Sequence, residues 1–336
     1  MSAAPQGAPV FGAPVRFGVL GCADIAWRRM LPVLTAAPDV EVVAVASRER
    51  ARARRFTDRF GGRPIEGYEA LLAARDVDAV YVPLPAMLHA EWVERALRAG
   101  KHVLAEKPLT GSAAETARLV ESASARGLAL VENVAFPHHA LHADVRDRLA
   151  HGAIGRLRGF GATFTIPVLP ASNVRHLPKV GGGALLDIGI YPVRAALEFC
   201  GPDLAVVGAV LREHGRTGAV VAGRVLLASA QGVTADLFFG MEHSYRNAYE
   251  FAGSEGRLTV DRVFTPPPSY RPVVCVERQD HREEFTVAAG DQFAAVVARF
   301  VAAVRSGGDA QGLAAASVRQ AELVAAIEEA AVRVTV

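Results

Sequence analysis

The stretch VRFGVLGCADIA, residues 15–26, decides the fold of the first half of the chain. Its apolar run at residues 15–20 leads directly into Gly21, and the small residue Ala26 follows with the spacing of a G-x-G-x-x-G/A turn between a strand and a helix. Ala23 stands where the middle glycine is usual, and an ordinary strand-to-helix turn is the alternative. Its position after the first apolar strand favours a dinucleotide-binding turn, with contacts from Gly21, Cys22, Ala23, Asp24 and Ile25.

Strand and helix patterns alternate from this turn to about residue 136. Further apolar runs come at residues 40–46, 79–82, 102–105 and 128–131. Helical patterns lie between them, at residues 25–36, 90–99 and 113–125. Apolar runs without polar alternation are typical of a parallel sheet with helices on both faces. We therefore predict an α/β domain over residues 15–136, a doubly wound Rossmann sheet that binds the dinucleotide, behind a disordered tail at residues 1–14.

The second half of the chain shows strands without a helix between each pair. Strand patterns come at residues 157–166, 205–212, 220–229, 233–239, 249–253, 258–260 and 273–277. Helical patterns come at residues 141–150, 185–199, 291–306 and 314–331. Strands in direct succession favour antiparallel pairing. We predict an α+β domain over residues 137–336 with a large, open, mostly antiparallel sheet for substrate binding and oligomerisation, and final helices that can pack back on the first domain.

Composition restricts the partners of this chain. Hydrophobic residues make up 51% of its 336 residues, and a net charge of +2 gives no general attraction to nucleic acid or to an anionic membrane. No apolar run reaches the roughly 18 residues that span a bilayer, and residues 1–14 lack the charged segment of a signal peptide. The three cysteines are far apart and have no metal-ligand spacing. We expect a cytoplasmic protein with no metal site and no nucleic-acid or membrane partner.

The end of the second predicted strand indicates which dinucleotide binds. NAD-binding sites usually have an acidic residue there that holds the ribose hydroxyls. This chain has Ser47 and Arg48 instead, and further arginines follow in the next helix. A hydroxyl and a guanidinium bind a 2′-phosphate, which a carboxylate would repel; a solvated helix start is the alternative. The pair predicts NADP(H) over NAD(H).

The triplet Glu106-Lys107-Pro108 follows the fifth strand of the predicted parallel sheet. It lies at the carboxyl edge, where a nicotinamide ring is expected. A lysine there can donate a proton to a substrate oxygen while hydride arrives at the carbon; a surface lysine beside a turn proline is the alternative. The fourth strand ends near Leu84, and His89 one helical turn later either lines the cofactor channel or only ends a helix.

Residues 181–192, GGGALLDIGIYP, form the sharpest motif of the second half. Its glycines let the backbone approach a ligand closely. Asp187 and Tyr191 are four residues apart, so a helix places them on one face. A carboxylate and a phenol that face one cleft suit hydroxyl binding and proton transfer, and a capped helix with a buried tyrosine is the alternative.

These motifs together resemble the Gfo/Idh/MocA family of sugar and inositol oxidoreductases: the turn at Gly21, the triplet at Lys107 and the helix with Asp187 and Tyr191. The resemblance covers nearly the whole chain after residue 15. Many members have histidine at the position of Tyr191. Tyrosine there, with AWRRMLP, FTIPVLP, GMEHSYRNAYEF and RVFTPPP, resembles the sugar-nucleotide 3-ketoreductases of actinomycete deoxysugar pathways. The resemblance implies NADPH-dependent reduction of the carbon-3 ketone of a TDP-linked 3,4-diketo-2,6-dideoxyhexose.

The resemblance also implies roles for single residues. Lys107 is expected to donate the proton to the forming hydroxyl, and Tyr191 to orient the sugar or serve as an alternate donor. The residues expected to line the dinucleotide or lie near its nicotinamide end are Glu106, Leu84, His89, Tyr68, Asp187 and Arg175. Contacts to the nucleotide-sugar are expected from Arg28, Tyr249 and Thr265, each of which has a purely structural alternative.

Two other functions remain open at the level of the sequence. One is an NADP-dependent dehydrogenase of a free sugar, an inositol or a dihydrodiol on the same scaffold. The other is a non-catalytic NADP-binding sensor, against which the presence of both Lys107 and Tyr191 argues. An open sheet with one uncovered face also predicts a homo-oligomer, a dimer or a tetramer.

Overall fold

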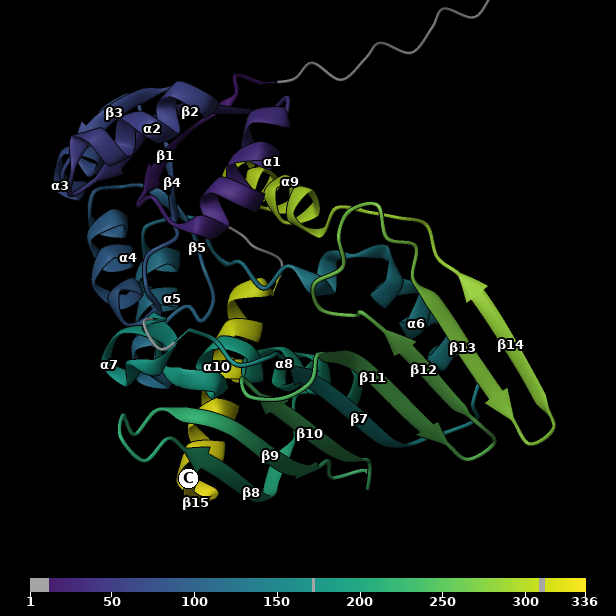
Figure 1. Ribbon diagram of the computed structural model, residues 1–336. Helices are drawn as coiled ribbons and strands as arrows, with labels where there is room; N and C mark the ends of the chain where they lie inside the picture. Colours follow the sequence, from purple (N-terminus) through teal and green to yellow (C-terminus); the bar gives the residue numbers. More distant parts are fainter. Residues whose placement is uncertain (1–11, 171–172, 308–311) are drawn as a thin grey trace, which may run out of the picture.

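The computed structural model describes residues 12–170, 173–307 and 312–336, so residues 1–11 of the predicted tail lie outside the described part. The chain forms two layers of sheet with helices between and around them (Figure 1). The N-terminal part holds a six-stranded sheet, and a broader nine-stranded sheet lies below it in the view of Figure 1.

All pairings in the first sheet are parallel, and the strand order is β3-β2-β1-β4-β5-β6. The strands are β1 (Val15–Leu20), β2 (Val40–Ser47), β3 (Arg63–Glu66), β4 (Ala79–Val82), β5 (His102–Ala105) and β6 (Leu130–Glu132). The order reverses between β1 and β4, which confirms the predicted Rossmann architecture. The sequence pattern does not reveal β3, because this short edge strand contains Pro64 and has no fully buried side chain.

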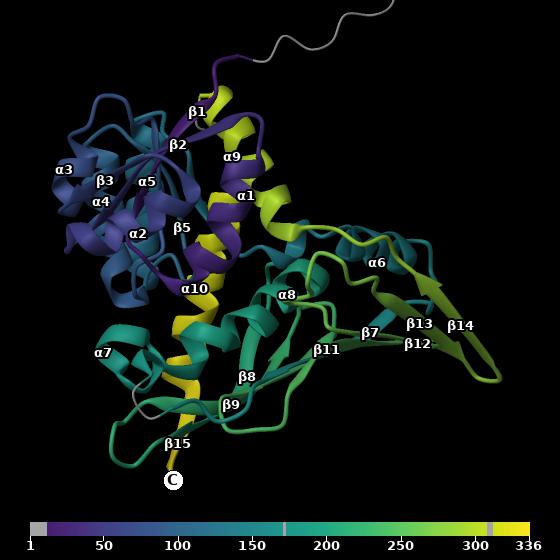
Figure 2. The ribbon, with the colours of Figure 1, turned by 45° about the horizontal axis from the view of Figure 1, so that its top comes forward.

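Helices cover both faces of the first sheet (Figure 2). The helices that follow its strands are α1 (Leu31–Ala36), α2 (Arg50–Phe60), α3 (Tyr68–Leu72), α4 (His89–Arg98) and α5 (Ala113–Ala125). A helix from the far end of the chain, α9 (Gln292–Arg305), packs beside α1. Its Phe300 ring lies 5.4 Å from the ring of Phe17 in β1. The C-terminal segment thus completes the core of the N-terminal part.

The second sheet has the strand order β14-β13-β12-β11-β7-β10-β9-β8-β15. Its strands are β7 (Leu157–Thr165), β8 (Ala205–Glu213), β9 (Val220–Ala228), β10 (Thr234–Gly240), β11 (Arg246–Gly253), β12 (Arg257–Asp261), β13 (Val273–Arg278), β14 (His281–Thr286) and β15 (Ala331–Thr335). The pairs β7–β10 and β8–β15 are parallel and the others antiparallel. The prediction of a mostly antiparallel sheet is confirmed, although β14 and β15 escape the sequence pattern because their side chains are largely exposed.

Helices on the inner face of the second sheet separate it from the first domain (Figure 2). They are α6 (Ala140–Ala150), α7 (Pro178–Gly181), α8 (Ile190–Cys200) and α10 (Leu313–Ala330). The stretch Pro178–Cys200 has a mean hydropathy of 1.2, which is high enough for a segment that crosses a bilayer. The sequence pattern did not reveal it, because charged residues interrupt its apolar run. However, 67% of its most apolar 18-residue part is buried inside the protein. The stretch is therefore hydrophobic because it lies in the core.

Candidate active site

Lys107 follows β5 and faces the second domain. Its Nζ donates to the backbone oxygen of Asp187 at 2.6 Å and to Oδ1 of the same residue at 2.9 Å. Both side chains keep a small exposed fraction, 13% for Lys107 and 15% for Asp187. The triplet of the first domain and the glycine-rich motif of the second therefore meet at one place, on the carboxyl edge of the parallel sheet.

Two glycines bring Asp187 to this place. Gly182 and Gly183 both have a φ of +74°, which glycine adopts without strain. A Cβ on Gly183 would lie 2.9 Å from the backbone oxygen of Val220, so the backbone approaches β9 too closely for a larger residue. A π-helical turn, Leu185–Gly189, follows and continues into α8. Asp187 therefore lies in a widened turn rather than in the regular helix that the spacing suggested.

Tyr191 stands beside the Lys107–Asp187 pair. Nζ of Lys107 lies 5.1 Å from the centre of the Tyr191 ring. The rings of Phe164 and Phe264 pack against that ring, with centroid distances of 5.2 and 5.7 Å. Within the described parts of the chain, its hydroxyl forms no hydrogen bond. A fixed ring with an unoccupied hydroxyl can hold an oxygen of a bound molecule.

The charges of these three groups depend on one another. Burial alone would lower the pKa of Lys107, but the Asp187 carboxylate, with smaller effects of Tyr191 and Glu106, raises it above the usual lysine value. Burial would raise the pKa of Asp187, but Lys107 and Arg175 lower it. Burial raises the pKa of Tyr191. At neutral pH the site therefore holds an ammonium, a carboxylate and a neutral phenol.

Arg175 approaches Asp187 from the side opposite Lys107. Its Nε donates to Oδ2 of Asp187 at 2.5 Å. Its backbone N–H donates to Oδ1 of Asn173 at 3.1 Å. The Arg175 side chain is 39% exposed. Asp187 thus has a cation at each carboxylate oxygen.

The glycine turn fits the phosphates of a dinucleotide. Gly21 has a φ of +129°, and a Cβ there would lie 2.9 Å from Cδ2 of Leu84. Ala26 is fully buried, which lets the helix pack closely on the sheet. The helix begins at Asp24, so its first N–H groups point toward the turn. Such N–H groups bind a pyrophosphate, and the residues from Gly21 to Ile25 form this turn beside Leu84.

A cluster of polar groups lies beside this turn, at the end of β2. Nη2 of Arg52 donates to the backbone oxygen of Cys22 at 2.8 Å. Burial raises the pKa of Tyr68, and the charges of Arg48 and Arg52 oppose this shift. In the described part of the protein neither arginine forms an ion pair. Two unpaired guanidinium groups beside Ser47 suit the 2′-phosphate of NADP(H).

Glu106 lies beneath the cleft rather than in it. The residue is buried, and its Oε1 accepts hydrogen bonds from the hydroxyl of Tyr81 at 2.7 Å and from Nδ2 of Asn133 at 2.6 Å. These bonds join the ends of β4, β5 and β6. Glu106 therefore fixes the backbone from which Lys107 projects.

His89 is also a buried residue with a structural role. It has no exposed surface, and its two ring nitrogens lie 2.7 Å from the backbone oxygens of Leu84 and Pro108. Burial lowers its pKa. It connects the end of β4 with the turn after Lys107, so any effect of His89 on a bound cofactor is exerted through these turns.

The three predicted contacts to a nucleotide-sugar do not gather in one place. Tyr249 is 2% exposed, and its hydroxyl lies 3.2 Å from Nδ1 of His142. The structure corrects its assignment as a substrate contact, because β11 turns the ring into the core. Thr265 is exposed and accepts from Nδ2 of Asn247 at 3.1 Å. Arg28 is exposed and forms an ion pair with Asp24.

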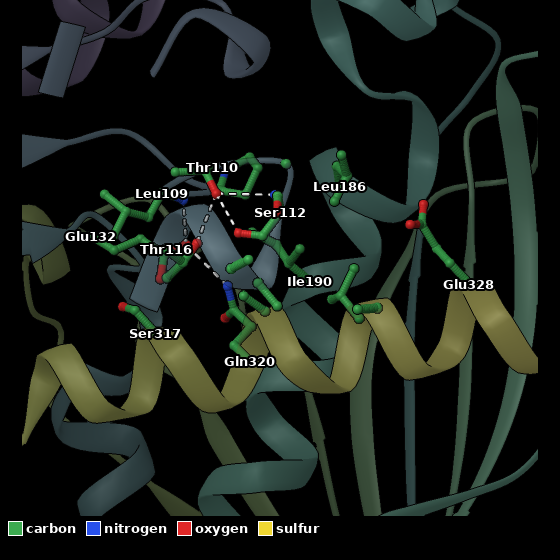
Figure 3. Close-up of a pocket in the computed structure, with 17 residues that line it drawn as sticks. Leu109, Thr110, Ser112, Thr116, Glu132, Leu186, Ile190, Ser317, Gln320 and Glu328 are labelled. Carbon is green, nitrogen blue, oxygen red and sulfur yellow. Dashed lines mark hydrogen bonds between the residues drawn. The ribbon is translucent and has the colours of Figure 1, made fainter. Parts of the chain in front are cut away.

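A second carboxylate–cation pair lies deeper between the domains. Oε2 of Glu132 accepts from Nη2 of Arg194 at 3.1 Å, and the side chains are only 1% and 5% exposed. Oε1 of Glu132 accepts from the backbone N–H of Leu109 and from Nε2 of Gln320, both at 3.0 Å. Figure 3 shows Glu132 and Gln320 meeting at one end of a cavity of about 310 Å³ between the turn after Lys107 and α10.

Sequence patterns alone do not reveal several of these residues. Arg52 is only one of several arginines in its helix, and its contact with the glycine turn depends on how α2 packs. Asn133 and Arg194 have no local motif, because their partners come from distant segments. Within the residues that the structure describes, no cluster of three or more His, Cys, Asp or Glu side chains could hold a metal ion.

Family models match both parts of the chain. A model described as an oxidoreductase family with an NAD-binding Rossmann fold matches residues 15–134, and the GFO/IDH/MocA C-terminal domain matches residues 142–259. The dTDP-3,4-didehydro-2,6-dideoxy-alpha-D-glucose 3-reductase of Actinomadura kijaniata is 58% identical over 96% of this chain and 97% of that protein. D-xylose 1-dehydrogenase (NADP(+)) 2 of Haloferax volcanii is 35% identical over 75% of this chain and 78% of that protein.

Solved structures extend this similarity to the fold. The crystal structure of a 3-ketoreductase from Actinomadura kijaniata in complex with NADP and TDP-benzene superimposes with a TM-score of 0.95. The two sequences are 57% identical, and the match covers 96% of this chain and 99% of that one. Both domains, and with them both sides of the cleft at Lys107, lie within the matched region.

Proposed function

This chain belongs to the Gfo/Idh/MocA oxidoreductase family, and we propose that it reduces the carbon-3 ketone of a TDP-linked 3,4-diketo-2,6-dideoxyhexose with NADPH. Its place is in deoxysugar biosynthesis, for the sugars of antibiotics. One observation carries the proposal: Lys107, Asp187 and Tyr191 meet from two domains at the carboxyl edge of a Rossmann sheet. The 3-reductase and the 3-ketoreductase of Actinomadura kijaniata support the substrate class.

The proposal divides the work between the domains. Residues 15–136 hold NADP(H), with the pyrophosphate at the turn after Gly21 and the 2′-phosphate at Ser47 and Arg48. Arg52, which donates to the turn at Cys22, and Arg48 support this placement, since neither forms an ion pair among the described residues. Residues 137–336 hold the sugar and bring Tyr191 to the cleft. Arg28 and Thr265, both exposed, are the remaining candidates for contacts to the nucleotide.

The chemistry follows from the charges at the cleft. NADPH, when bound, supplies the hydride, and negative charge then develops on the oxygen of the ketone. The Lys107 ammonium stabilises this charge and donates the proton from Nζ. Asp187 holds that ammonium in place from Oδ1 and from its backbone oxygen. The Tyr191 hydroxyl orients the sugar and can serve as an alternate donor.

The outer face of the second sheet supports self-association. Several apolar side chains on β8, β9 and β15 are more than two-fifths exposed: Val207, Val210, Leu226, Val332 and Val334. Exposed apolar groups on a sheet favour burial against a second copy. We propose a homo-oligomer, a dimer or a tetramer, formed through this face. Light scattering at micromolar concentration should show more than a monomer, and a monomer alone contradicts the proposal.

The same proposal places the protein in the cytoplasm, without nucleic-acid or membrane partners. Cys22, Cys200 and Cys275 are free thiols in the structure, which suits a reducing compartment. The near balance of 37 basic and 35 acidic side chains gives no general attraction to a polyanion.

A second candidate function is the oxidation of a free sugar, an inositol or a dihydrodiol, favoured by the similarity to an NADP-dependent xylose dehydrogenase. The deciding assay follows NADPH oxidation with enzymatically generated TDP-3,4-diketo-2,6-dideoxyglucose. In parallel, NADP⁺ reduction is followed with free D-xylose, myo-inositol and a dihydrodiol. We expect turnover only with the TDP-sugar. Equal or faster turnover of a free substrate would favour the dehydrogenase, and no hydride transfer at all would favour a non-catalytic sensor.

A further inference from the structure

Asp187 has two carboxylate oxygens, and a different cation occupies each of them. Nζ of Lys107 takes Oδ1 at 2.9 Å together with the backbone oxygen at 2.6 Å. Nε of Arg175 takes Oδ2 at 2.5 Å. A carboxylate with one cation can rotate and present either oxygen. With two cations on opposite sides it has one favoured orientation, and this orientation points Oδ1 at Lys107.

Arg175 is itself held in position. Oδ1 of Asn173 accepts from the backbone N–H of Arg175 at 3.1 Å and from Nη1 at 3.5 Å. The helix that follows, α7, contacts the short helix Ala86–Leu88, which comes directly after β4 in the first domain. The segment that carries Arg175 therefore connects the two domains beside the cleft.

We propose that Arg175 is a positioning residue for the reduction: it locks the Asp187 carboxylate so that Oδ1 holds the Lys107 ammonium at the reacting oxygen. This inference rests on the proposed 3-ketoreductase function and deepens it. Arg175 acts through Asp187, because its bonds go to that carboxylate and to Asn173. This arrangement of three charged side chains, Lys107, Asp187 and Arg175, requires a planar guanidinium or at least a cation at residue 175.

The proposal has a consequence for pH dependence. The groups that face Asp187 are Lys107 and Arg175, with Tyr191 beside them and Glu106 behind Lys107. Both cations lower the pKa of Asp187 against the effect of burial. Removal of Arg175 leaves one cation, so this pKa rises. Asp187 then takes up a proton at a higher pH during acidification, and Lys107 loses its carboxylate partner earlier.

The test compares Arg175→Met with Arg175→Lys and with a matched control, Lys179→Met. Lys179 lies nearby in α7 and is exposed, and it forms no ion pair among the described residues. Single-turnover NADPH oxidation is measured between pH 5 and 9. For Arg175→Met we expect a rate about tenfold lower at neutral pH and an acid limb about one pH unit higher. Arg175→Lys should recover most of the rate, and Lys179→Met should match the unmodified protein.

Two outcomes overturn the proposal. If Arg175→Met raises KM for the TDP-sugar while kcat and its acid limb stay unchanged, Arg175 binds substrate rather than positioning Asp187. If Arg175→Met behaves like Lys179→Met in every respect, the contact with Asp187 has no role. The dissociation constant for NADPH, measured by fluorescence titration, should change less than about threefold, because the bonds of Arg175 go to Asp187 and Asn173.

A second readout does not depend on turnover. The chain has only three lysines, Lys101, Lys107 and Lys179, so protein labelled with ¹³C at the lysine ε-carbon gives three assignable NMR signals. The Lys107 signal senses the protonation of Asp187 as the pH falls. We expect this inflection to move to higher pH in Arg175→Met but not in Arg175→Lys. If the inflection stays at the same pH in Arg175→Met, the proposed positioning role of Arg175 is wrong even if the TDP-sugar is turned over. If the inflection moves but no turnover is seen, only the proposed function is wrong.

Discussion

Two of the carboxylate–cation pairs that join the domains, Glu132–Arg194 and Lys107–Asp187, differ in what surrounds them. Glu132 and Arg194 are 1% and 5% exposed, and Glu132 is further bonded by Leu109 and Gln320. The Lys107–Asp187 pair is 13% and 15% exposed, with the partly exposed Arg175 as its further partner. Arg194 and Asp187 come from the same helical stretch, so the difference is set by depth and not by chain segment.

The difference shows how similar side chains serve different purposes. A buried ion pair whose groups bond to further side chains is costly to break, because loss of one partner leaves an uncompensated charge. A pair at the edge of a cleft keeps one ion within reach of a bound molecule and can exchange a proton with it. We therefore assign stability to Glu132–Arg194 and chemistry to Lys107–Asp187. Substitutions at the two pairs, and at residues close to the cleft, test this assignment.

The largest expected effect is on stability, at the deep pair. Arg194→Met leaves the Glu132 carboxylate buried without its cation, which should cost about 3–5 kcal/mol in the free energy of unfolding. Urea denaturation of the two proteins measures this loss. The control is Arg54→Met, which breaks an exposed pair with Asp58 and should cost less than about 1 kcal/mol. Equal losses in the two variants would contradict the contrast.

The next largest effect is on turnover, at the cleft pair. Lys107→Ala removes the proton donor and the cation at the reacting oxygen, so the rate of NADPH oxidation should fall at least about a hundredfold. NADPH affinity should change much less. Single-turnover kinetics with parallel NADPH titrations measure both, and Lys179→Ala is the matched control. Near-normal turnover would leave Lys107 as a positioning residue only, with Tyr191 or solvent as the donor.

A smaller effect is expected from the neighbouring phenol. Tyr191→Phe keeps the ring that packs on Phe164 and Phe264 and removes only the hydroxyl. The rate should fall by about tenfold or less, because Lys107 still supplies the proton. The same single-turnover assay measures it. A loss larger than that of Lys107→Ala would move the proton donor to Tyr191.

The smallest effect concerns Arg48, for which the described residues provide no ion-pair partner. Because Ser47 and Arg48 replace an acidic residue, NADPH should bind at least about tenfold more tightly than NADH, about 1.4 kcal/mol. Arg48→Ala should remove most of this preference without changing stability. Dissociation constants for both cofactors test this, with Arg54→Ala as a control on the adjacent helix. Equal constants in the unmodified protein would refute the assignment to NADP(H).

Local patterns predicted the elements that carry buried residues. The strand at residues 15–20 and the helix at residues 113–125 agree with the structure at both ends, because buried strands and amphipathic helices leave a clear periodicity. β14 and β15 leave none, since a strand at the edge of a sheet need not alternate apolar and polar side chains. The π-helical turn at Leu185–Gly189 likewise has no sequence pattern of its own.

Site residues were predictable where one short motif contains them. They were not predictable where the packing of distant segments decides which residues meet. Lys107, Asp187 and Tyr191 follow from short motifs, and the structure brings them within contact of one another. Tyr249 was misassigned because the sequence has no feature that tells which face of β11 its side chain takes. Its ring points into the core and contacts His142. Arg52 and Arg194 depend on contacts between distant segments.

The most direct test of the central claim follows the hydride itself. Enzyme in excess is mixed with TDP-3,4-diketo-2,6-dideoxyglucose and NADPH that carries deuterium at both C4 positions of the nicotinamide, and the sugar product is examined by NMR and mass spectrometry. We predict one deuterium, on carbon 3 of the TDP-linked product, formed at a rate that Lys107→Ala reduces. Deuterium on carbon 4, or NADPH that remains unoxidised, would contradict the assignment of this protein as a 3-ketoreductase.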